Sequence, residues 1–443
     1  MTTRQKIWSI CLLVVFVVVL IGGTSAYAKD PVKKIKIGVI GPMKFSAGKH
    51  EWWGAQMAAE EINSAGGIRI KDVKHEIELV QADSNEILSM TDAVTAMERL
   101  VTVDKVNFVT GGYLTEPTMA MQEVIADNRI IYIGGAGSPE LTARLAKNYD
   151  RYKYYFRAIH INSALMVQIN FILIDMIGNK VKTELGIAKP RVAFLLDKIK
   201  VGDPIVEIGR NLIPKLGMEL AGVWRTSPRA TDYSPELAAI KDSGAHAIVT
   251  FFAGPSGIIF SKQWGELKIP AVPAGMNMEA YEKAYWSKTG GMCEYETIYN
   301  NFGPVEITAK SMPFYKKYLE KTGEYPTPMA GAYDGLYILK DATERAGSLE
   351  TEAVLLALEK TNYTGVCGKY AFYPRDHKWP HDLIWGPDHV IFPGLQWRDG
   401  KLLVVWPDGR AALGDEKWKG VRFKGTVEYQ LPPWMVEYWK SRK

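Results

Sequence analysis

The chain has 443 residues, of which 47% are hydrophobic, and a formal net charge of +5. This near-neutral balance, without a block of basic residues, argues against nucleic acid as a partner. The length exceeds what one hydrophobic core usually covers, so we expect two lobes.

The first 28 residues have the layout of a secretory signal peptide. Arg4 and Lys6 precede an uncharged apolar run over 10–21, and Ala26-Tyr27-Ala28 forms an A-x-A cleavage pattern. The run is shorter than the ~20 apolar residues that span a bilayer. We therefore expect cleavage after Ala28 and a periplasmic or otherwise extracytoplasmic protein.

Short apolar runs alternate with longer amphipathic segments from Ile35 to Gly134. The predicted strands are IKIGVIG (35–41), HEIELVQ (75–81), VNFVT (106–110) and IIYIG (130–134), and the predicted helices cover 52–63, 87–101 and 119–126. This β-α-β-α order indicates a mostly parallel sheet covered by helices on both faces.

The same alternation of short apolar runs and longer amphipathic segments begins again after Tyr154. Strands are predicted over 154–158, 191–196, 218–224, 247–252 and 269–272, with helices over 164–177, 204–216, 235–241 and 257–267. We therefore predict an α/β protein with two doubly wound parallel-sheet lobes in tandem. Helices return over 309–321, 329–346 and 350–360, before a tail rich in Trp and Pro, so the chain is expected to cross between the lobes more than once.

Ligands of open parallel sheets bind beyond the carboxyl ends of the strands. Segments rich in Gly or Pro follow the predicted strands at 41–46, 111–115, 134–138, 197–202, 252–256 and 274–277. Glycine lets a ligand approach the backbone, and the next helix offers free N–H groups to an anion.

In TGGYLTEPT (110–118), Thr115 stands at a helix N-cap position and Pro117 in the first turn, and helix capping alone explains both residues. Capping does not explain Tyr113, which we expect to point toward the crevice.

Other site chemistries find little support in the sequence. Cys293 and Cys367 are expected to form a disulfide, because two cysteines in an oxidising compartment usually pair. His377 and His381 have an H-x-x-x-H spacing, but Pro380 breaks the helix that would align them, so we predict a solvated loop and no metal site. A nucleophile elbow, a P-loop and a dinucleotide fingerprint are missing, so we expect neither an enzyme nor a cofactor.

Four runs, taken together and in order, carry a family resemblance: IKIGVIGPM, AAEEINSAGGI, SPELTAR followed by FRA, and DYSPELAAIKDSGAHAIV. They resemble the extracytoplasmic substrate-binding proteins of ABC importers for branched-chain amino acids, the leucine/isoleucine/valine-binding type. The resemblance covers about 35–373, and the tail from Pro374 is not covered.

This resemblance implies a type I periplasmic binding fold, with two lobes that are joined by three crossovers and close on a ligand by a hinge motion. Lobe I is expected to hold 33–157 and 301–362, and lobe II 158–300 and 363–443. It also implies a monomer without catalysis that delivers a small-molecule ligand to an ABC permease in the membrane.

The resemblance also implies particular ligand-binding residues. In amino-acid-binding members, hydroxyls and backbone N–H groups of the first lobe hold the ligand carboxylate, and the matching positions are Tyr113, Leu114, Thr115, Gly135, Ala136, Gly137 and Ser138. A second-lobe aromatic and an acidic residue hold the ammonium, at strand ends that here carry Phe252, Gly254, Met276 and Asn277.

No carboxylate occupies either strand end, and an ammonium buried without a counter-charge is costly. Either Asp197 or another acid supplies the charge, or the ligand is not an α-amino acid. The other candidates form an aromatic-rich set: Phe45, Trp52, Trp53, His160 and Tyr333. We therefore predict a small carboxylate or amide with an apolar or aromatic body.

Two other functions stay open on the sequence alone. The same body can serve as the sensory module of a receptor, although the C-terminal WMVEYWKSRK is too polar to be a transmembrane segment. A secreted α/β hydrolase would need a nucleophile and a base, and no motif supplies them.

Overall fold

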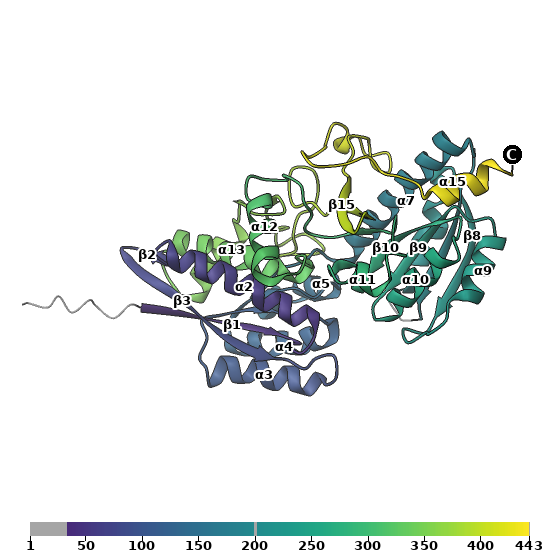
Figure 1. Cartoon of the computed structure of the whole chain (residues 1–443). Helices are drawn as coiled ribbons and strands as arrows, with labels where there is room; N and C mark the ends of the chain where they lie inside the picture. Colours follow the sequence, from purple (N-terminus) through teal and green to yellow (C-terminus); the bar gives the residue numbers. More distant parts are fainter. Residues whose placement is uncertain (1–32, 199–201, 443) are drawn as a thin grey trace, which may run out of the picture.

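The computed structural model describes residues 33–198 and 202–442, which form two α/β lobes joined side by side (Figure 1). Lobe I holds the start of the chain, and lobe II carries the teal strands at the opposite end of Figure 1. This confirms the predicted two-lobe α/β architecture. The predicted signal peptide lies outside the described residues.

The sheet of lobe I has the strand order β2-β3-β1-β4-β5-β6, and every neighbouring pair is parallel except β2 with β3. The first strand carries Ile35, Ile37, Val39 and Ile40, all fully buried, as expected for a parallel strand covered on both faces. The elements are β1 (Lys33–Gly41), α2 (Ser46–Ser64), β2 (Ile68–Ile70), β3 (Val73–Asp83), α3 (Met90–Thr102), β4 (Phe108–Gly111), α4 (Thr115–Asn128), β5 (Ile131–Gly134), α5 (Glu140–Lys147), α6 (Tyr149–Tyr152), β6 (Tyr155–Arg157), α12 (Ser311–Thr322), η3 (Pro328–Gly331), α13 (Ala332–Ala346) and α14 (Thr351–Glu359).

The sheet of lobe II has the order β15-β14-β11-β10-β9-β7-β8, in which β14 runs antiparallel to both of its neighbours, β11 and β15, and the other neighbouring pairs are parallel. Its elements are α7 (Ser163–Leu185), β7 (Arg191–Asp197), α8 (Gly202–Leu212), η1 (Pro214–Leu216), β8 (Glu219–Thr226), α9 (Ser234–Asp242), β9 (Ala247–Phe252), α10 (Ser256–Glu266), β10 (Val272–Asn277), η2 (Met278–Tyr281), α11 (Tyr285–Lys288), β11 (Thr297–Tyr299), β14 (Gly394–Arg398), β15 (Lys401–Trp406), η4 (Glu416–Trp418) and α15 (Pro433–Lys440).

Both sheets share one winding pattern, because β3-β1-β4-β5-β6 in lobe I matches β8-β7-β9-β10-β11 in lobe II. In each, the chain first adds a strand on one side and then returns to the other. The order therefore reverses between β1 and β4 in lobe I and between β7 and β9 in lobe II. Adjoining loops diverge at such switch points, which is where open α/β sheets bind ligands.

Helix α7 is longer than the sequence predicted. We expected it to end at Gly178, but it continues to Leu185 and ends at Gly186 in a left-handed conformation. Gly178 instead lies so close to Met218 that a Cβ there would collide with its sulfur. The glycine therefore serves close packing. Although α7 is long and apolar enough to span a membrane, it is mostly buried and is the core helix of lobe II.

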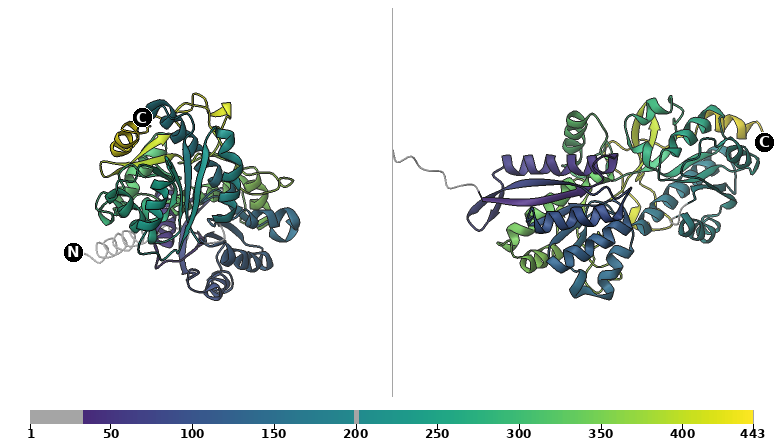
Figure 2. Two further views of the ribbon diagram at one scale, coloured as in Figure 1. Left: turned by 90° about the vertical axis from the view of Figure 1, so that its right-hand side faces the viewer. Right: turned by 90° about the horizontal axis from the view of Figure 1, so that it is seen from below.

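The boundary of lobe I near 362 was wrong, because the chain stays on lobe I for another thirty or so residues. A hairpin of β12 (Tyr363–Thr364) and β13 (Lys369–Tyr370) places the Tyr370 hydroxyl 2.8 Å from the Asp334 carboxylate of α13. Phe372 then packs on Phe156 of β6, with ring centroids 5.0 Å apart. From Gly394 the tail adds β14 and β15 to the sheet of lobe II. Figures 1 and 2 show the yellow C-terminal end of the chain on this lobe.

The predicted disulfide is also wrong, because Cys293 and Cys367 are both free and buried. Cys293 lies in the interior of lobe II, whereas the Cys367 thiol donates to the Asn301 carbonyl at 3.2 Å. Burial raises the pKa of both thiols, which keeps them protonated and unreactive.

Candidate functional site

The carboxyl edges of the two sheets meet at the junction of the lobes. Glu282 follows η2 in lobe II. Burial tends to raise the pKa of its carboxyl, but a hydrogen bond with the Ser46 side chain of α2, in the other lobe, contributes to a net lowering. Burial raises the pKa of Tyr281, and the phenol of Tyr113 in lobe I adds to the effect. The Lys283 N–H donates across the junction to Glu324 at 3.1 Å. The loops after β1 and β4 of lobe I therefore face the segment that follows β10 in lobe II.

The joint between β4 and α4 is built on two glycines. Gly111 and Gly112 have φ values of +119° and +84°, and a Cβ on Gly111 would collide with the Ile40 carbonyl. Only glycine fits this turn without strain. The chain can therefore reverse directly at the switch point of lobe I.

The predicted N-cap Thr115 is wrong, since α4 begins at Thr115 and has no side-chain cap from its own N-cap residue, Leu114. The carboxylate of Glu86 takes that role from the loop after β3. It accepts from the Tyr113 N–H at 3.2 Å and from the Leu114 N–H at 2.6 Å. The free N–H groups at the start of α4 are therefore already bound to a carboxylate of the protein itself, that of Glu86.

The loop over 135–138 is held by Arg157 at the end of β6. Its fully buried guanidinium donates to the Ala136 carbonyl and, at 2.5 Å, to the Ser138 carbonyl. The Gly137 carbonyl accepts from the Ser163 N–H of α7 at 2.7 Å. Because C=O and N–H point opposite ways across a trans peptide, the N–H groups of Gly137 and Ser138 point away from these partners. Within the described part of the chain neither N–H has an acceptor, so both can bind a ligand oxygen.

Arg157 is itself paired with Asp382 from the tail, at 3.0 Å and with both side chains fully buried. The other Asp382 oxygen accepts from Thr142 at 3.0 Å and from Asn162 at 2.9 Å. Asn162 caps α7 of lobe II. One tail carboxylate therefore links the ligand loop of lobe I to the first crossover between the lobes.

In lobe II, the carboxylate of Asp197 caps the loop before α10. It accepts from the Ala253 N–H at 2.8 Å and from the Ser256 hydroxyl at 3.4 Å. Burial raises its pKa. Both oxygens thus have protein donors, which leaves Asp197 less suited to an ammonium than we expected. Gly254 beside it is half-buried, and Met276 is buried at the end of β10.

Two predicted residues of lobe II point into its interior. The Phe252 ring packs on Phe260, with centroids 4.7 Å apart. The Asn277 side chain donates to Tyr285 and Glu296, each at 2.8 Å. Both are fully buried, so their side chains belong to the interior of lobe II.

Glu296 makes stability depend on pH, and the effect is testable. Burial raises the pKa of this carboxyl from 4.5 to about 7. A carboxyl whose pKa is raised by folding stabilises the protein fully below its unfolded pKa, and that contribution is lost as the pH rises through 7. The Glu296→Gln variant should therefore gain up to about 3 kcal/mol relative to wild type between pH 4.5 and pH 8. Urea unfolding of both proteins at the two pH values measures this, and parallel pH profiles would contradict it.

The other predicted aromatic residues separate into two groups. Phe45 is 37% exposed at the N-cap of α2, and Trp52 and Trp53 are half-buried on that helix. Tyr333 instead donates to Glu61 at 2.5 Å, within the contact of α13 with α2. His160 is buried in the first crossover, where its Nδ1 lies 2.9 Å from the Ile161 carbonyl.

Sequence reasoning missed the buried carboxyl of Glu51. Its side chain is fully buried on α2, and neither oxygen has a hydrogen-bond partner among the described residues. A Cβ on Gly41 would collide with one oxygen, and a Cβ on Gly135 would lie 3.4 Å from the other. Glu51 therefore lies across the carboxyl edge of the sheet, between the ends of β1 and β5. Its position four residues from both Ala47 and Ala55, on the buried face of the helix, could have revealed it.

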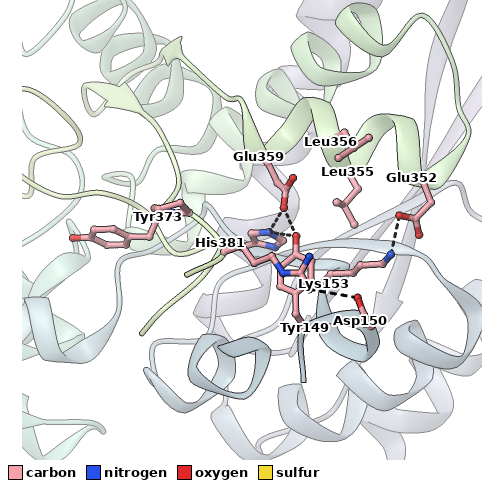
Figure 3. Close-up of a pocket in the computed structure, with 11 residues that line it drawn as sticks. Tyr149, Asp150, Lys153, Glu352, Leu355, Leu356, Glu359, Tyr373 and His381 are labelled. Carbon is pink, nitrogen blue, oxygen red and sulfur yellow. Dashed lines mark hydrogen bonds and ion pairs between the residues drawn. The ribbon is translucent and has the colours of Figure 1, made fainter. Parts of the chain in front are cut away.

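A separate cavity of about 340 Å³ lies on the flank of lobe I, between α6, α14 and tail residues 373–381 (Figure 3). None of the predicted ligand residues lines it. Polar groups in its lining contact one another: Lys153 lies 2.9 Å from Glu352, and His381 Nε2 lies 3.2 Å from the Glu359 carboxylate. His381 is buried, so the loop predicted to be solvated is packed instead. Over 33–198 and 202–442, no group of three or more His, Cys, Asp or Glu could hold a metal ion.

Comparison with known proteins identifies the family of the chain. The family model described as "Periplasmic binding protein" matches residues 34–385. The Leu/Ile/Val-binding protein homolog 7 of Brucella melitensis is 23% identical over 421 residues, which cover 90% of this chain and 97% of that protein.

Two solved structures share the fold. The substrate-binding protein LivJ of Streptococcus pneumoniae, in complex with isoleucine, has a TM-score of 0.63 at 22% identity, covering 84% of this chain and 98% of that one. A solute-binding protein of R. palustris, in complex with benzoate, has a TM-score of 0.63 at 14% identity, covering 84% and 95%.

Proposed function

Because the chain belongs to the periplasmic binding protein family, we propose that it captures a small ligand between its lobes and delivers it to an ABC permease. Such a protein needs no catalytic group, because its affinity comes from closing a cleft around a few hydrogen bonds.

The observation that carries this proposal is that the switch point of lobe I faces the segment after β10 of lobe II. The loops after β1 and β4 face η2 and the loop after it across the junction, where Tyr113 lies close to Tyr281 and Ser46 to Glu282. A ligand held there touches both lobes. Its binding energy therefore favours the closed arrangement over the open one, which is the differential affinity that a hinge motion requires.

For the ligand we propose a small carboxylate or amide with an apolar or aromatic body. The free N–H groups of Gly137 and Ser138 suit a ligand oxygen. Phe45, Trp52 and Tyr113 are partly exposed aromatic residues, the first two at and on α2 and the third in the loop before α4. One solved relative of this fold binds isoleucine and another binds benzoate, so the fold accommodates both kinds of body.

We further propose that the mature chain works outside the cytoplasm, after cleavage following Ala28, and as a monomer. Its permease would recognise the closed pair of lobes.

The test is native mass spectrometry of the protein purified without refolding. We expect one small molecule per chain, released on unfolding. A second measurement, a thermal-shift screen of amino acids, carboxylic acids and amides, should find compounds that raise the melting temperature. A protein that carries no molecule and responds to no compound of these classes would contradict the proposal.

A further inference from the structure

Two buried carboxyl groups lie at the switch point of lobe I: Glu51 of α2 and Glu86 of the loop after β3. We call them the acidic pair. They are close enough that Glu86 raises the pKa of Glu51, beyond the larger effect of burial. Members of this fold can offer helix N–H groups to a ligand anion at such an edge, whereas here two carboxyl groups stand there.

Glu86 occupies the donors that an anionic ligand would use. It takes the N–H groups of Tyr113 and Leu114, together with the Ser84 hydroxyl at 2.8 Å. A ligand carboxylate would have to displace it or lie beside it, and like charges in a buried site repel strongly. The first of the two predicted carboxylate loops is therefore closed to carboxylates.

Glu51, in contrast, is fully buried, and neither of its oxygens has a hydrogen-bond partner within the described residues. The nearby Gly112 N–H lowers the pKa of Glu51, but it donates its hydrogen bond to the Ile40 carbonyl at 2.8 Å. A buried polar group without a hydrogen bond costs several kcal/mol, so such groups are rare unless a ligand or water completes them. Since Glu86 has protein donors and Glu51 has none, the pair keeps its charge on Glu86 and a proton on Glu51. Protonated Glu51 can still accept a hydrogen bond at its carbonyl oxygen.

Tyr113 connects the acidic pair to the cleft. Burial raises the pKa of its phenol to about 12, and the charges of Glu86 and Glu51 contribute. The same phenol acts on Tyr281 of lobe II. Tyr113 therefore lies close both to the buried acidic pair and to Tyr281 of the opposite lobe.

We propose that Glu51 contacts the ligand and accepts a hydrogen bond from a nitrogen donor, the N–H of an amide or amino group. The cleft then selects ligands that combine this nitrogen with an oxygen for the Gly137 and Ser138 N–H groups, and it disfavours carboxylates that lack such a nitrogen. This inference rests on the proposed capture function and narrows its ligand class.

Matched ligand pairs test the proposal by isothermal titration calorimetry. Phenylacetamide is compared with phenylacetate, and leucine with 4-methylpentanoate, which is leucine without its amino group. In at least one pair, the compound with the nitrogen donor should bind wild-type protein about 10- to 100-fold more tightly than its partner, as expected for a hydrogen bond to a buried carboxyl group.

The Glu51→Leu variant should lose this preference, and its melting temperature without ligand should be unchanged or higher, because an unpaired buried carboxyl has been removed. Glu60→Leu is the matched control. Glu60 is exposed on the same helix and pairs with Lys321, so this change should leave the preference intact.

Two results would overturn the inference and leave the capture function standing: acids that bind as tightly as their partners, or an unchanged preference in Glu51→Leu. If no compound of either pair binds, the inference also fails. The mass-spectrometric measurement then decides the capture function separately.

Discussion

Replacing Asp382 by alanine is expected to lower the free energy of unfolding by about 3–5 kcal/mol, because it leaves Arg157 as an unpaired charge in the interior. Ligand binding should weaken as well. Without its partner, Arg157 no longer holds the carbonyls of Ala136 and Ser138 in place, and the N–H groups of Gly137 and Ser138 lose their fixed direction.

Asp376→Ala is the matched control, since Asp376 is exposed on the same tail segment. It should change stability by about 0.5 kcal/mol or less. Urea unfolding measures the first effect, and calorimetry with a bound compound measures the second. If Asp382→Ala unfolds like wild type, the buried pair does not hold the loop, and our account of the tail is wrong.

Replacing Trp397 by alanine is expected to cost about 3–5 kcal/mol of stability, as for other fully buried tryptophans. The effect should also reach the cleft. The Trp397 indole donates to the Ala280 carbonyl at 3.1 Å, and η2, which contains Ala280, carries Tyr281 to the junction. Its ring also lies 6.2 Å from Tyr325 of lobe I.

The half-buried Trp379, which lies under Lys378, provides the comparison. Trp379→Ala should cost about 1 kcal/mol or less and leave ligand affinity unchanged. Thermal unfolding and calorimetry of the two variants distinguish a local packing effect from a change in the cleft. Loss of stability in Trp397→Ala with unchanged affinity would show that the tail supports lobe II alone.

Local sequence patterns predicted the fold well, because a parallel strand buried on both faces must be apolar throughout. The runs that became β1, β4, β5 and β9 show this. Glycine was harder to interpret. Gly178 looked like a helix end, yet it permits close packing against Met218, and only Gly186 ends the helix. A sequence shows that a glycine is present but not which neighbour requires it.

Strand order predicted where the candidate loops lie, and ligand binding by these loops stays a prediction. The loops around Tyr113 and Gly137 lie where strand order placed them, because switch points follow from topology. Asp382 could not be predicted, since it meets Arg157 across more than two hundred residues of chain. Glu51 was overlooked because the predicted helix began at Trp52, whereas α2 begins at Ser46. Helical spacing places Glu51 on the buried face and Glu60 on the exposed one, which single residues do not reveal.

The predicted disulfide also failed for a reason that the sequence could not show. Composition and compartment favoured a disulfide between Cys293 and Cys367, but the fold buries each thiol in a separate environment. Pairing depends on distance between side chains, which composition cannot supply.

Small-angle X-ray scattering with and without the co-purifying molecule tests hinged capture most directly. We expect the radius of gyration to decrease when the molecule is added back to stripped protein, as the lobes close across the junction of Tyr113 and Tyr281. Scattering curves that coincide at saturating ligand would contradict the account.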